Sequence, residues 1–166
     1  MRLAIIGYSG SGKSTLAKYL GEKYQIPVLH LDRVHWLPGW QERKRAESAE
    51  IVKQFLDEHK SWVIDGTYSA LEFERRLEEA DKIVLMNFRR LPCFFRAWKR
   101  YVQNRGRTRE SMGEGCKERM NPEFIWWLLH RKKSQKERYR KVLERYGEKT
   151  LVISTQKELD KGMREL

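Results

Sequence analysis

The N-terminal segment of the chain constrains the fold more than any other feature. Leu3–Ile6 is an apolar run typical of a buried strand, and Lys13–Lys23 has apolar residues at helical spacing. Between them, Gly7–Thr15 fits G-x-x-x-x-G-K-[ST], the phosphate-binding P-loop, in the strand-to-helix context that the motif requires. The sequence therefore predicts a strand, a phosphate-binding loop and a helix in direct succession. The alternative, a glycine-rich turn that only joins strand to helix, fits the full match poorly.

The residue types of this loop suit a nucleoside triphosphate. Glycines let backbone N–H groups turn inward around phosphate oxygens, and the helix N-terminus adds positive potential at the same point. Lys13 reaches the β- and γ-phosphates, and the Ser14 hydroxyl is a ligand for Mg²⁺. The expected ligands are ATP and Mg²⁺, and the expected phosphate contacts come from Gly7, Ser9, Gly10, Ser11, Gly12, Lys13, Ser14 and Thr15.

The 166 residues suffice for one domain with a sizeable core but not for two ordinary ones, so residues 1–166 are expected to form a single domain. No apolar run approaches the ~20 residues of a membrane span. Cys93 and Cys116 show neither a disulfide framework nor zinc-ligand spacing. A cytoplasmic, reduced protein without a membrane partner is expected.

The formal net charge of +12 is concentrated in one third of the chain. Residues 89–141 contain 17 Lys and Arg against 5 Asp and Glu, whereas basic and acidic residues cancel elsewhere. Such a region contacts nucleic acid, surrounds a polyphosphate site, or is a solvated helix face. For Arg131–Lys141 we favour the solvated face, because its basic residues recur along a long polar helix.

Apolar segments alternate with helical patterns along the whole chain. After the first strand and helix, strands are expected at Ile26–Leu31, Trp62–Ile64, Lys82–Phe88 and Thr150–Ser154. Helices are expected at Ala46–Glu58, Ala70–Glu79, Pro92–Asn104, Glu123–Tyr146 and Gln156–Met163, with a mobile loop, or lid, over about 105–118. Five strands with intervening helices predict an α/β fold, with a parallel sheet covered on both faces.

Ligands of parallel sheets gather at the carboxyl ends of the strands, where two acidic residues are expected. Asp65 ends the run Trp62–Ile64 in the Walker B pattern and is expected to hold Mg²⁺, directly or through water, unless it only begins the turn at Gly66. Asp32 ends the second expected strand and either accepts the proton of an acceptor hydroxyl or caps a turn. Three aromatic side chains are candidate walls of an acceptor pocket: Trp36, Trp40 and Tyr68.

Arginines around the expected lid are suited to a triphosphate. Arg96 and Arg100 lie four residues apart on one face of the helix that leads into it. Closure would exclude water and stabilise the charge of a phosphoryl group in transfer. We expect Arg96 and Arg100 to contribute first, with one further contributor among Arg107, Arg109 and Arg119, and the other arginines to be solvated.

Several segments together resemble a known family. These are the P-loop, Leu31-Asp32 with Trp36–Trp40, Trp62–Tyr68, Arg89, Cys93, Arg96, Arg100, Gly115-Cys116, Phe124 and Trp127. They resemble the adenylate-kinase-like P-loop proteins known as DNA topology modulation (FlaR-related) proteins, over nearly the whole chain. The resemblance implies a three-layer nucleoside/nucleotide kinase fold with sheet order 2-3-1-4-5 and an arginine-rich lid after the fourth strand. It also implies that Arg96, Arg100 and Thr155–Lys157 lie near the adenine or the phosphates.

The chain departs from related kinases in two places. His30-Leu31-Asp32 stands where small-molecule kinases often carry Asp-x-Asp, so a second metal-binding acid is missing. The segment after Gly66 lacks the Phe-Pro-Arg with which nucleoside monophosphate kinases grip the acceptor phosphate, which leaves the acceptor open. The expected function is transfer of the γ-phosphoryl group of ATP to a nucleoside, nucleotide or similar hydroxylated metabolite. The alternative is an ATP-responsive, nucleic-acid-binding regulator that acts through residues 89–141.

Overall fold

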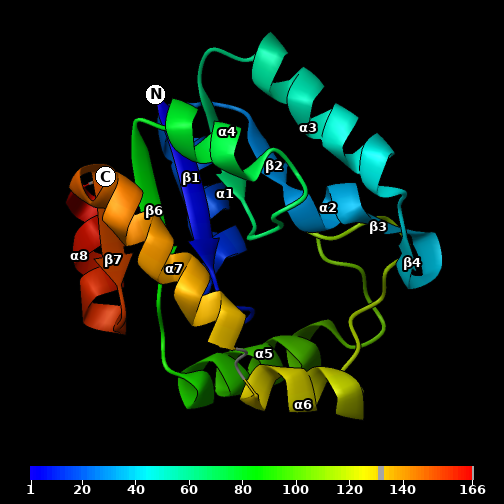
Figure 1. Ribbon diagram of the computed structural model, residues 1–166. Helices are drawn as coiled ribbons and strands as arrows, with labels where there is room; N and C mark the ends of the chain where they lie inside the picture. The colour runs from blue at the N-terminus through cyan, green and yellow to red at the C-terminus, as the bar shows by residue number, and fades with distance from the viewer. Residues whose placement is uncertain (131–132, 166) are drawn as a thin grey trace.

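A five-stranded parallel sheet forms the centre of the structure (Figure 1). The computed structural model describes residues 1–130 and 133–165. The strand order is β2-β5-β1-β6-β7, and each pair of neighbours is parallel. The strands span Arg2–Gly7 (β1), Val28–His30 (β2), Trp62–Asp65 (β5), Lys82–Met86 (β6) and Thr150–Ile153 (β7). The mixed α/β architecture with a parallel sheet, which the sequence predicts, is confirmed.

Helices cover both faces of this sheet, because successive side chains of a buried strand point to opposite sides. Leu3 and Ile5 pack in one apolar cluster with α1, α5, α6 and α8, whereas Ala4 and Ile6 pack in a second cluster with α2, α3, α4 and α7. The helices span Lys13–Tyr24 (α1), Leu31–His35 (α2), Arg45–Glu58 (α3), Phe73–Glu79 (α4), Arg90–Asn104 (α5), Pro122–Leu129 (α6), Lys133–Tyr146 (α7) and Gln156–Glu165 (α8). None of the helices in residues 1–130 and 133–165 is both long and apolar enough for a membrane span.

The strand order β2-β5-β1-β6-β7 differs in detail from the expected order 2-3-1-4-5, because the chain contains two strands that were not predicted. The segment predicted as a loop after the second strand contains β3 (Trp36–Leu37) and β4 (Gln41–Glu42), which pair as a separate antiparallel sheet. These two strands take the numbers between the second and third strands of the main sheet. The prediction that Asp32 ends the second strand is wrong, because β2 ends at His30 and Asp32 lies in the short helix α2.

The single helix predicted over Glu123–Tyr146 is also wrong, because the chain forms two helices there. Helix α6 ends at Leu129 and α7 begins at Lys133, and the two run in different directions (Figure 1). Leu128 is buried in one apolar cluster, whereas Tyr139 and Val142 are buried in the other, across the sheet. One straight helix cannot place its side chains in both clusters. Residues 131–132, the start of the predicted solvated face, lie outside the described residues.

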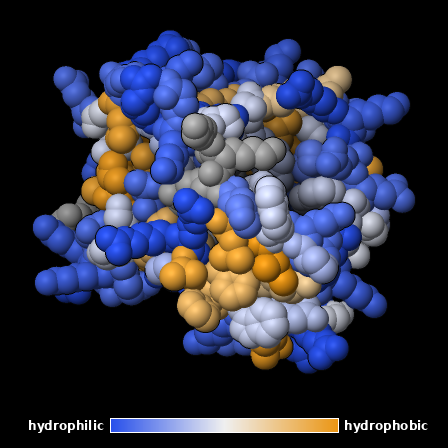
Figure 2. Space-filling view, turned by 60° about the horizontal axis from the view of Figure 1, so that its bottom comes forward, coloured by the Kyte–Doolittle hydropathy of each residue, from blue (hydrophilic) through white to orange (hydrophobic). Residues whose placement is uncertain are grey.

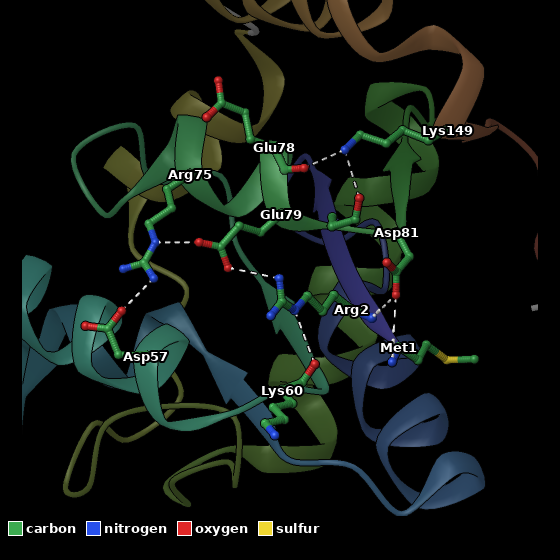
Figure 3. A network of polar contacts seen from close by, with 10 residues as sticks. Met1, Arg2, Asp57, Lys60, Arg75, Glu78, Glu79, Asp81 and Lys149 are labelled. Carbon is green, nitrogen blue, oxygen red and sulfur yellow. Dashed lines mark hydrogen bonds and ion pairs between the residues drawn. The ribbon is translucent and has the colours of Figure 1, made fainter.

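A polar network links the N-terminal end of β1 to α4 (Figure 3). It lies at the end of the sheet away from Gly7–Thr15, here called the glycine-rich loop. The backbone N–H of Arg2 donates to Asp81 at 2.7 Å, and the guanidinium of Arg2 contacts Glu79 at 3.4 Å. Arg75 pairs with Glu79 and, across to α3, with Asp57, each at 2.6 Å. This network holds β1 and α4 together at the end of the sheet opposite the glycine-rich loop.

Gly10 brings the glycine-rich loop into direct contact with α5. It has a φ of 75°, and a Cβ at this position would lie 2.3 Å from the carbonyl oxygen of Cys93. We expect Gly10→Ala to lower the free energy of unfolding by about 3 kcal/mol, because the new methyl group meets backbone and the φ angle disfavours it. Urea unfolding followed by tryptophan fluorescence measures the change.

Gly147→Ala is the matched control, because nothing lies within 4 Å of the position that a Cβ would take there. We expect this variant to stay within about 0.5 kcal/mol of the original chain. Equal effects of the two substitutions would contradict the close approach of the loop to α5.

Candidate active site

The glycine-rich loop wraps around the N-terminus of α1 and presents polar groups toward a cavity. Lys13 Nζ donates to the carbonyl oxygen of Tyr8 at 2.9 Å, which holds the ammonium over the loop. Burial lowers the pKa of Lys13, although the carboxylates of Asp32 and Asp65 oppose the shift. The hydroxyl of Ser11 is buried without a hydrogen-bond partner among the described residues. The loop thus carries a desolvated cation and an unpaired hydroxyl, both suited to an anionic ligand.

Asp65 lies beside the loop and contacts two side chains. Its Oδ2 accepts a hydrogen bond from Ser14 Oγ at 2.8 Å, and its Oδ1 contacts His30 Nδ1. The register of the parallel pair β2 and β5 places His30 directly opposite Asp65. The described residues contain no cluster of three His, Cys, Asp or Glu side chains. The oxygens of Ser14 and Asp65 fit Mg²⁺, which is usually held by one or two carboxylates together with substrate phosphates.

A cavity of about 610 Å³, here called the loop cavity, runs along the glycine-rich loop toward α5 and α8. Arg96 crosses it: Nη1 donates to the carbonyl oxygen of Ser11 at 3.1 Å, and Nη2 donates to Gln156 Oε1 at 2.7 Å. The guanidinium of Arg96 also lies over the ring of Phe88, 4.1 Å from its centroid. The loop cavity is lined by all residues from Ser9 to Leu16 and by Lys99, Gln103, Leu159 and Met163 among others.

A second cavity, of about 440 Å³ and here called the aromatic cavity, lies on the other side of Lys13. Asp32 is fixed there by a hydrogen bond of 2.7 Å from the Tyr68 hydroxyl to Oδ1. Burial raises the pKa of Tyr68, and the negative charge of Asp32 adds to the shift, so the phenol stays a donor. The aromatic walls of this cavity are Trp36, Trp40, Tyr68, Phe124 and Trp127.

The two cavities meet at one set of side chains. The residues that line both are Ser9, Lys13, Asp32, Arg100 and Arg109. The junction therefore holds three cationic groups and one carboxylate, contributed by four different segments of the chain. A ligand in the loop cavity and a ligand in the aromatic cavity would meet there.

Glu118 holds the two arginines of the junction. Its side chain is only 3% exposed, and its two carboxylate oxygens accept separate hydrogen bonds, from Arg100 Nε at 2.9 Å and from Arg109 Nε at 2.5 Å. Burial lowers the pKa of Arg100, and the charge of Arg109 adds to this shift, while Glu118 opposes it. Glu118 thus keeps two like charges together in a desolvated site.

The 105–118 segment is docked on the Trp36–Trp40 segment. Trp40 Nε1 donates to the carbonyl oxygen of Lys117 at 3.0 Å, and Cys116 Sγ contacts the carbonyl oxygen of Leu37 at 3.1 Å. A Cβ on Gly113 would lie 2.0 Å from the carbonyl oxygen of Trp36, so the two backbones touch. The 105–118 segment therefore closes one side of the aromatic cavity.

Two further arginines line the aromatic cavity without a carboxylate partner in the described part of the chain. Arg119 lies over the ring of Trp40, 4.3 Å from its centroid, and Arg138 of α7 donates to the carbonyl oxygen of Thr67 at 3.2 Å. Their positive charges are therefore available to a ligand. They make the cavity attractive to an anion.

A buried arginine, Arg76, fixes the loop that carries Thr67 and Tyr68. Arg76 donates to the carbonyl oxygens of Leu71, Gly66 and Tyr68, at 2.8, 3.2 and 2.9 Å. Burial lowers the pKa of Arg76 to about 10. Thr67 Oγ1 in turn donates to the carbonyl oxygen of Gly7 at 3.0 Å, so this loop is fixed to the glycine-rich loop as well.

The structure brings most of the predicted site residues together, and their roles stay predictions. Residues Ser9 to Thr15 line the loop cavity with Arg96; Lys13, Asp32 and Arg100 lie at the junction, and Gly7 and Asp65 line the aromatic cavity. Gln156 of the Thr155–Lys157 segment lines the loop cavity, whereas Arg105 and Arg107 line neither.

Sequence reasoning missed four residues of this site: His30, Arg76, Glu118 and Arg138. His30 has a signal in the sequence, since it lies near the end of an expected strand, as Asp65 does. Glu118 has no such signal in the sequence, because a buried acidic residue in a loop of mixed charge looks the same as a solvated acidic residue. Only the tertiary structure shows that Glu118 is buried.

Some basic residues of the 89–141 region and its neighbourhood form ion pairs, whereas others line the aromatic cavity. On α7, Arg140 pairs with Glu137 and Glu144, and Arg145 pairs with Glu74 and Glu78 of α4. Arg138, in contrast, lines the aromatic cavity. These contacts do not test a nucleic-acid partner of residues 89–141, which stays a prediction.

Comparison with known proteins identifies the fold. No known family profile matches the chain, and no curated protein matches it in sequence. Among solved structures, the chain is similar to deoxyadenosine kinase from M. mycoides with bound dCTP (13% identity, covering 99% of this chain and 98% of that one, TM-score 0.54). It is also similar to TT1252 from Thermus thermophilus (16%, 100% and 97%, 0.54) and to an uncharacterized protein from Eubacterium ventriosum (17%, 99% and 95%, 0.50).

These likenesses define the class of fold: the chain is an α/β protein with a nucleotide-kinase-like fold. Identities of this size show the fold alone. They do not confirm the resemblance to the FlaR-related proteins.

The Glu118 carboxylate allows a direct test of the junction. We expect Glu118→Gln to lower the free energy of unfolding by about 2 kcal/mol, because Arg100 and Arg109 would be left partly buried without their counter-charge. Urea unfolding measures the loss, and it should persist in high salt because a buried pair is little screened. Glu144→Gln, which removes a solvent-exposed partner of Arg140, should leave the urea midpoint unchanged. A loss that salt abolishes would contradict a buried pair.

Proposed function

We propose that the chain is an ATP-dependent kinase that transfers the γ-phosphoryl group of ATP to a small acceptor. The junction of the two cavities at Lys13, Asp32, Arg100 and Arg109 is the observation that carries this proposal. Phosphoryl transfer requires two ligands in line, with cationic groups where they meet. A site for a nucleotide alone would need only the loop cavity.

ATP binds in the loop cavity, with its phosphates on the glycine-rich loop. Backbone N–H groups of the loop and the ammonium of Lys13 bind the β- and γ-phosphates, and the carbonyl contact of Lys13 with Tyr8 gives way to them. Ser14 and Asp65 would hold Mg²⁺, which would neutralise phosphate charge. Arg96 and Gln156 lie where the nucleoside part of ATP extends from the loop.

Asp32 receives the proton of the acceptor. The Tyr68 hydroxyl occupies Oδ1 of Asp32, which orients the carboxylate and leaves Oδ2 to face an acceptor hydroxyl. The acceptor oxygen forms a bond to the γ-phosphorus as the bond from the γ-phosphorus to the bridging oxygen of ADP breaks. The hydroxyl proton passes to Asp32, and Lys13, Arg100 and Arg109 stabilise the charge of the transferring group.

The aromatic cavity indicates what kind of acceptor this is. Flat rings stack on indole and phenyl side chains, and here they would lie among Trp36, Trp40 and Phe124. Arg119 and Arg138 offer charge to an anionic group, as a phosphate or a carboxylate. An acceptor with a ring, a hydroxyl and an anionic group, such as a nucleotide, fits these walls.

Replacement of Lys13 tests the kinase reaction. With a panel of nucleosides, nucleotides and other hydroxylated metabolites, at least one compound should raise ADP formation from ATP above the acceptor-free rate. Lys13→Ala should lower that acceptor-dependent kcat roughly 100-fold or more, because one cation of the junction is lost. A coupled assay for ADP measures both.

Lys23→Ala is the control, since Lys23 lies at the far end of α1, over the rings of Tyr19 and Tyr24. Its kinetics should equal those of the original chain. The kinase proposal fails if no compound of the panel raises ADP formation and Lys13→Ala leaves the background unchanged.

Replacement of Arg138 tests the anionic group of the acceptor. Arg138→Ala should raise the KM for a nucleotide acceptor about tenfold or more, since a hydrogen bond to a charged group contributes ~1.5 kcal/mol or more. The KM for ATP should not change, because Arg138 does not line the loop cavity. Arg140→Ala, two residues along α7, is the matched control and should change neither constant. Equal KM values for neutral and anionic acceptors in all three chains would contradict this role.

A further inference from the structure

The outer face of α5 carries a stripe of large apolar side chains in solvent. Leu91, Phe95, Trp98 and Val102 are 62%, 64%, 46% and 59% exposed. Their spacing of four, three and four residues places them along one side of the helix. The opposite side of α5 is used inside the protein, where Cys93 and Ala97 are buried and Arg96 and Arg100 reach the site described above.

Helix α6 packs beside α5 and widens this apolar surface. Trp126 is 62% exposed and Trp127 is 39% exposed. Figure 2, which brings the side of α5 and α6 forward, shows the apolar patch among hydrophilic side chains. Soluble chains rarely leave a contiguous patch of more than a few hundred Å² uncovered. Because Trp127 lines the aromatic cavity, the stripe of α5 together with Trp126 alone is here called the α5 patch.

The spacing within the stripe is the same in both directions along the helix. A two-fold axis at right angles to α5, midway between Phe95 and Trp98, would place Leu91 of one copy opposite Val102 of another and Phe95 opposite Trp98. This is the alternating packing of an antiparallel helix pair, and a two-fold contact requires a surface that is complementary to itself. We propose that the α5 patch is the interface through which two copies of this chain form a symmetric dimer.

The exposed area is of the size that a dimer needs. With aromatic side chains of ~200 Å² each, the exposed fractions of Phe95, Trp98 and Trp126 add up to roughly 340 Å². Leu91 and Val102 increase that area. A stable interface buries ~800 Å² on each partner, of which a rim of polar side chains supplies part.

The flanks of the stripe suit a second copy better than a lipid surface. Helices that lie on membranes carry Lys and Arg along the borders of the apolar face. Here one border of the stripe carries Lys99, but the other border is aromatic. The ring of Phe94 lies 6.3 Å from that of Trp98, and the ring of Tyr101 lies 6.1 Å from it. In an antiparallel pair the aromatic borders of both copies fall on the same side and extend the apolar contact.

A dimer of this kind would also stabilise the helix that carries Arg96 and Arg100. Because α5 leads directly into the 105–118 segment, the partner would hold one end of that segment in place. The dimer does not depend on the proposed kinase reaction, since it rests on the exposed side chains of the α5 patch and not on the two cavities.

Sedimentation velocity over a range of concentrations tests the dimer. The chain should sediment as a species of twice the 20.0 kDa of one copy. Phe95→Lys and Trp98→Glu should each give a species of 20.0 kDa, because a charge would be buried in the contact. An equal mixture of the two variants should restore the dimer, because position 95 of one copy lies opposite position 98 of the other.

Ile51→Glu on α3 is the matched control: Ile51 is also exposed, at 37%, but lies away from the α5 patch, so the dimer should remain. Far-ultraviolet circular dichroism and the urea midpoint of each variant show whether it is folded. The proposal is overturned by a 20.0 kDa species at every concentration, by a dimer that both variants retain, or by a mixture that stays monomeric. Flotation of a monomeric chain with phosphatidylserine vesicles would assign the patch to a membrane surface instead and would equally overturn the dimer.

Discussion

The buried carboxylate of Glu118 is the contact on which the arrangement of the site depends. It holds Arg100 of α5 and Arg109 of the 105–118 segment in one place, although their like charges repel in a desolvated environment. Because both guanidinium groups line both cavities, this carboxylate determines that the loop cavity and the aromatic cavity share cationic walls. Without this carboxylate, no ion pair would hold Arg109 of the 105–118 segment beside Arg100 at the junction.

Helix α5 links this contact to the rest of the molecule. Its backbone touches Gly10 of the glycine-rich loop, and two of its arginines reach the loop cavity and Glu118. Its other side carries the exposed apolar stripe. The helix is thus apolar in solvent and polar toward the site, the reverse of an ordinary surface helix. A partner on its outer face would stabilise the same helix that carries Arg96 and Arg100.

Much of the fold could be predicted from local patterns, because they are strong in the buried strands and at the glycine-rich loop. The strand that ends at Asp65 and the helix that begins at Lys13 occur where the sequence indicates. The failures come from contacts that local patterns do not contain. The segment predicted as one helix over Glu123–Tyr146 forms two helices, because its apolar residues pack in clusters on opposite faces of the sheet. The segment after Asp32 forms two short strands that pair with each other.

The sequence by itself determined the strand, glycine-rich loop and helix at the N-terminus, since the glycines, Lys13 and Ser14 lie within a few residues of one another. It also determined the α/β class, because the alternation of strand and helix patterns is local. Only the tertiary structure decided which charges are paired and which are free. Glu118 pairs with both Arg100 and Arg109, whereas Arg119 and Arg138 have no carboxylate partner in the described residues. Sequence distance does not predict these pairings. The reason is physical: the free energy of a charged group depends on its burial and on the charges and dipoles that folding brings close to it.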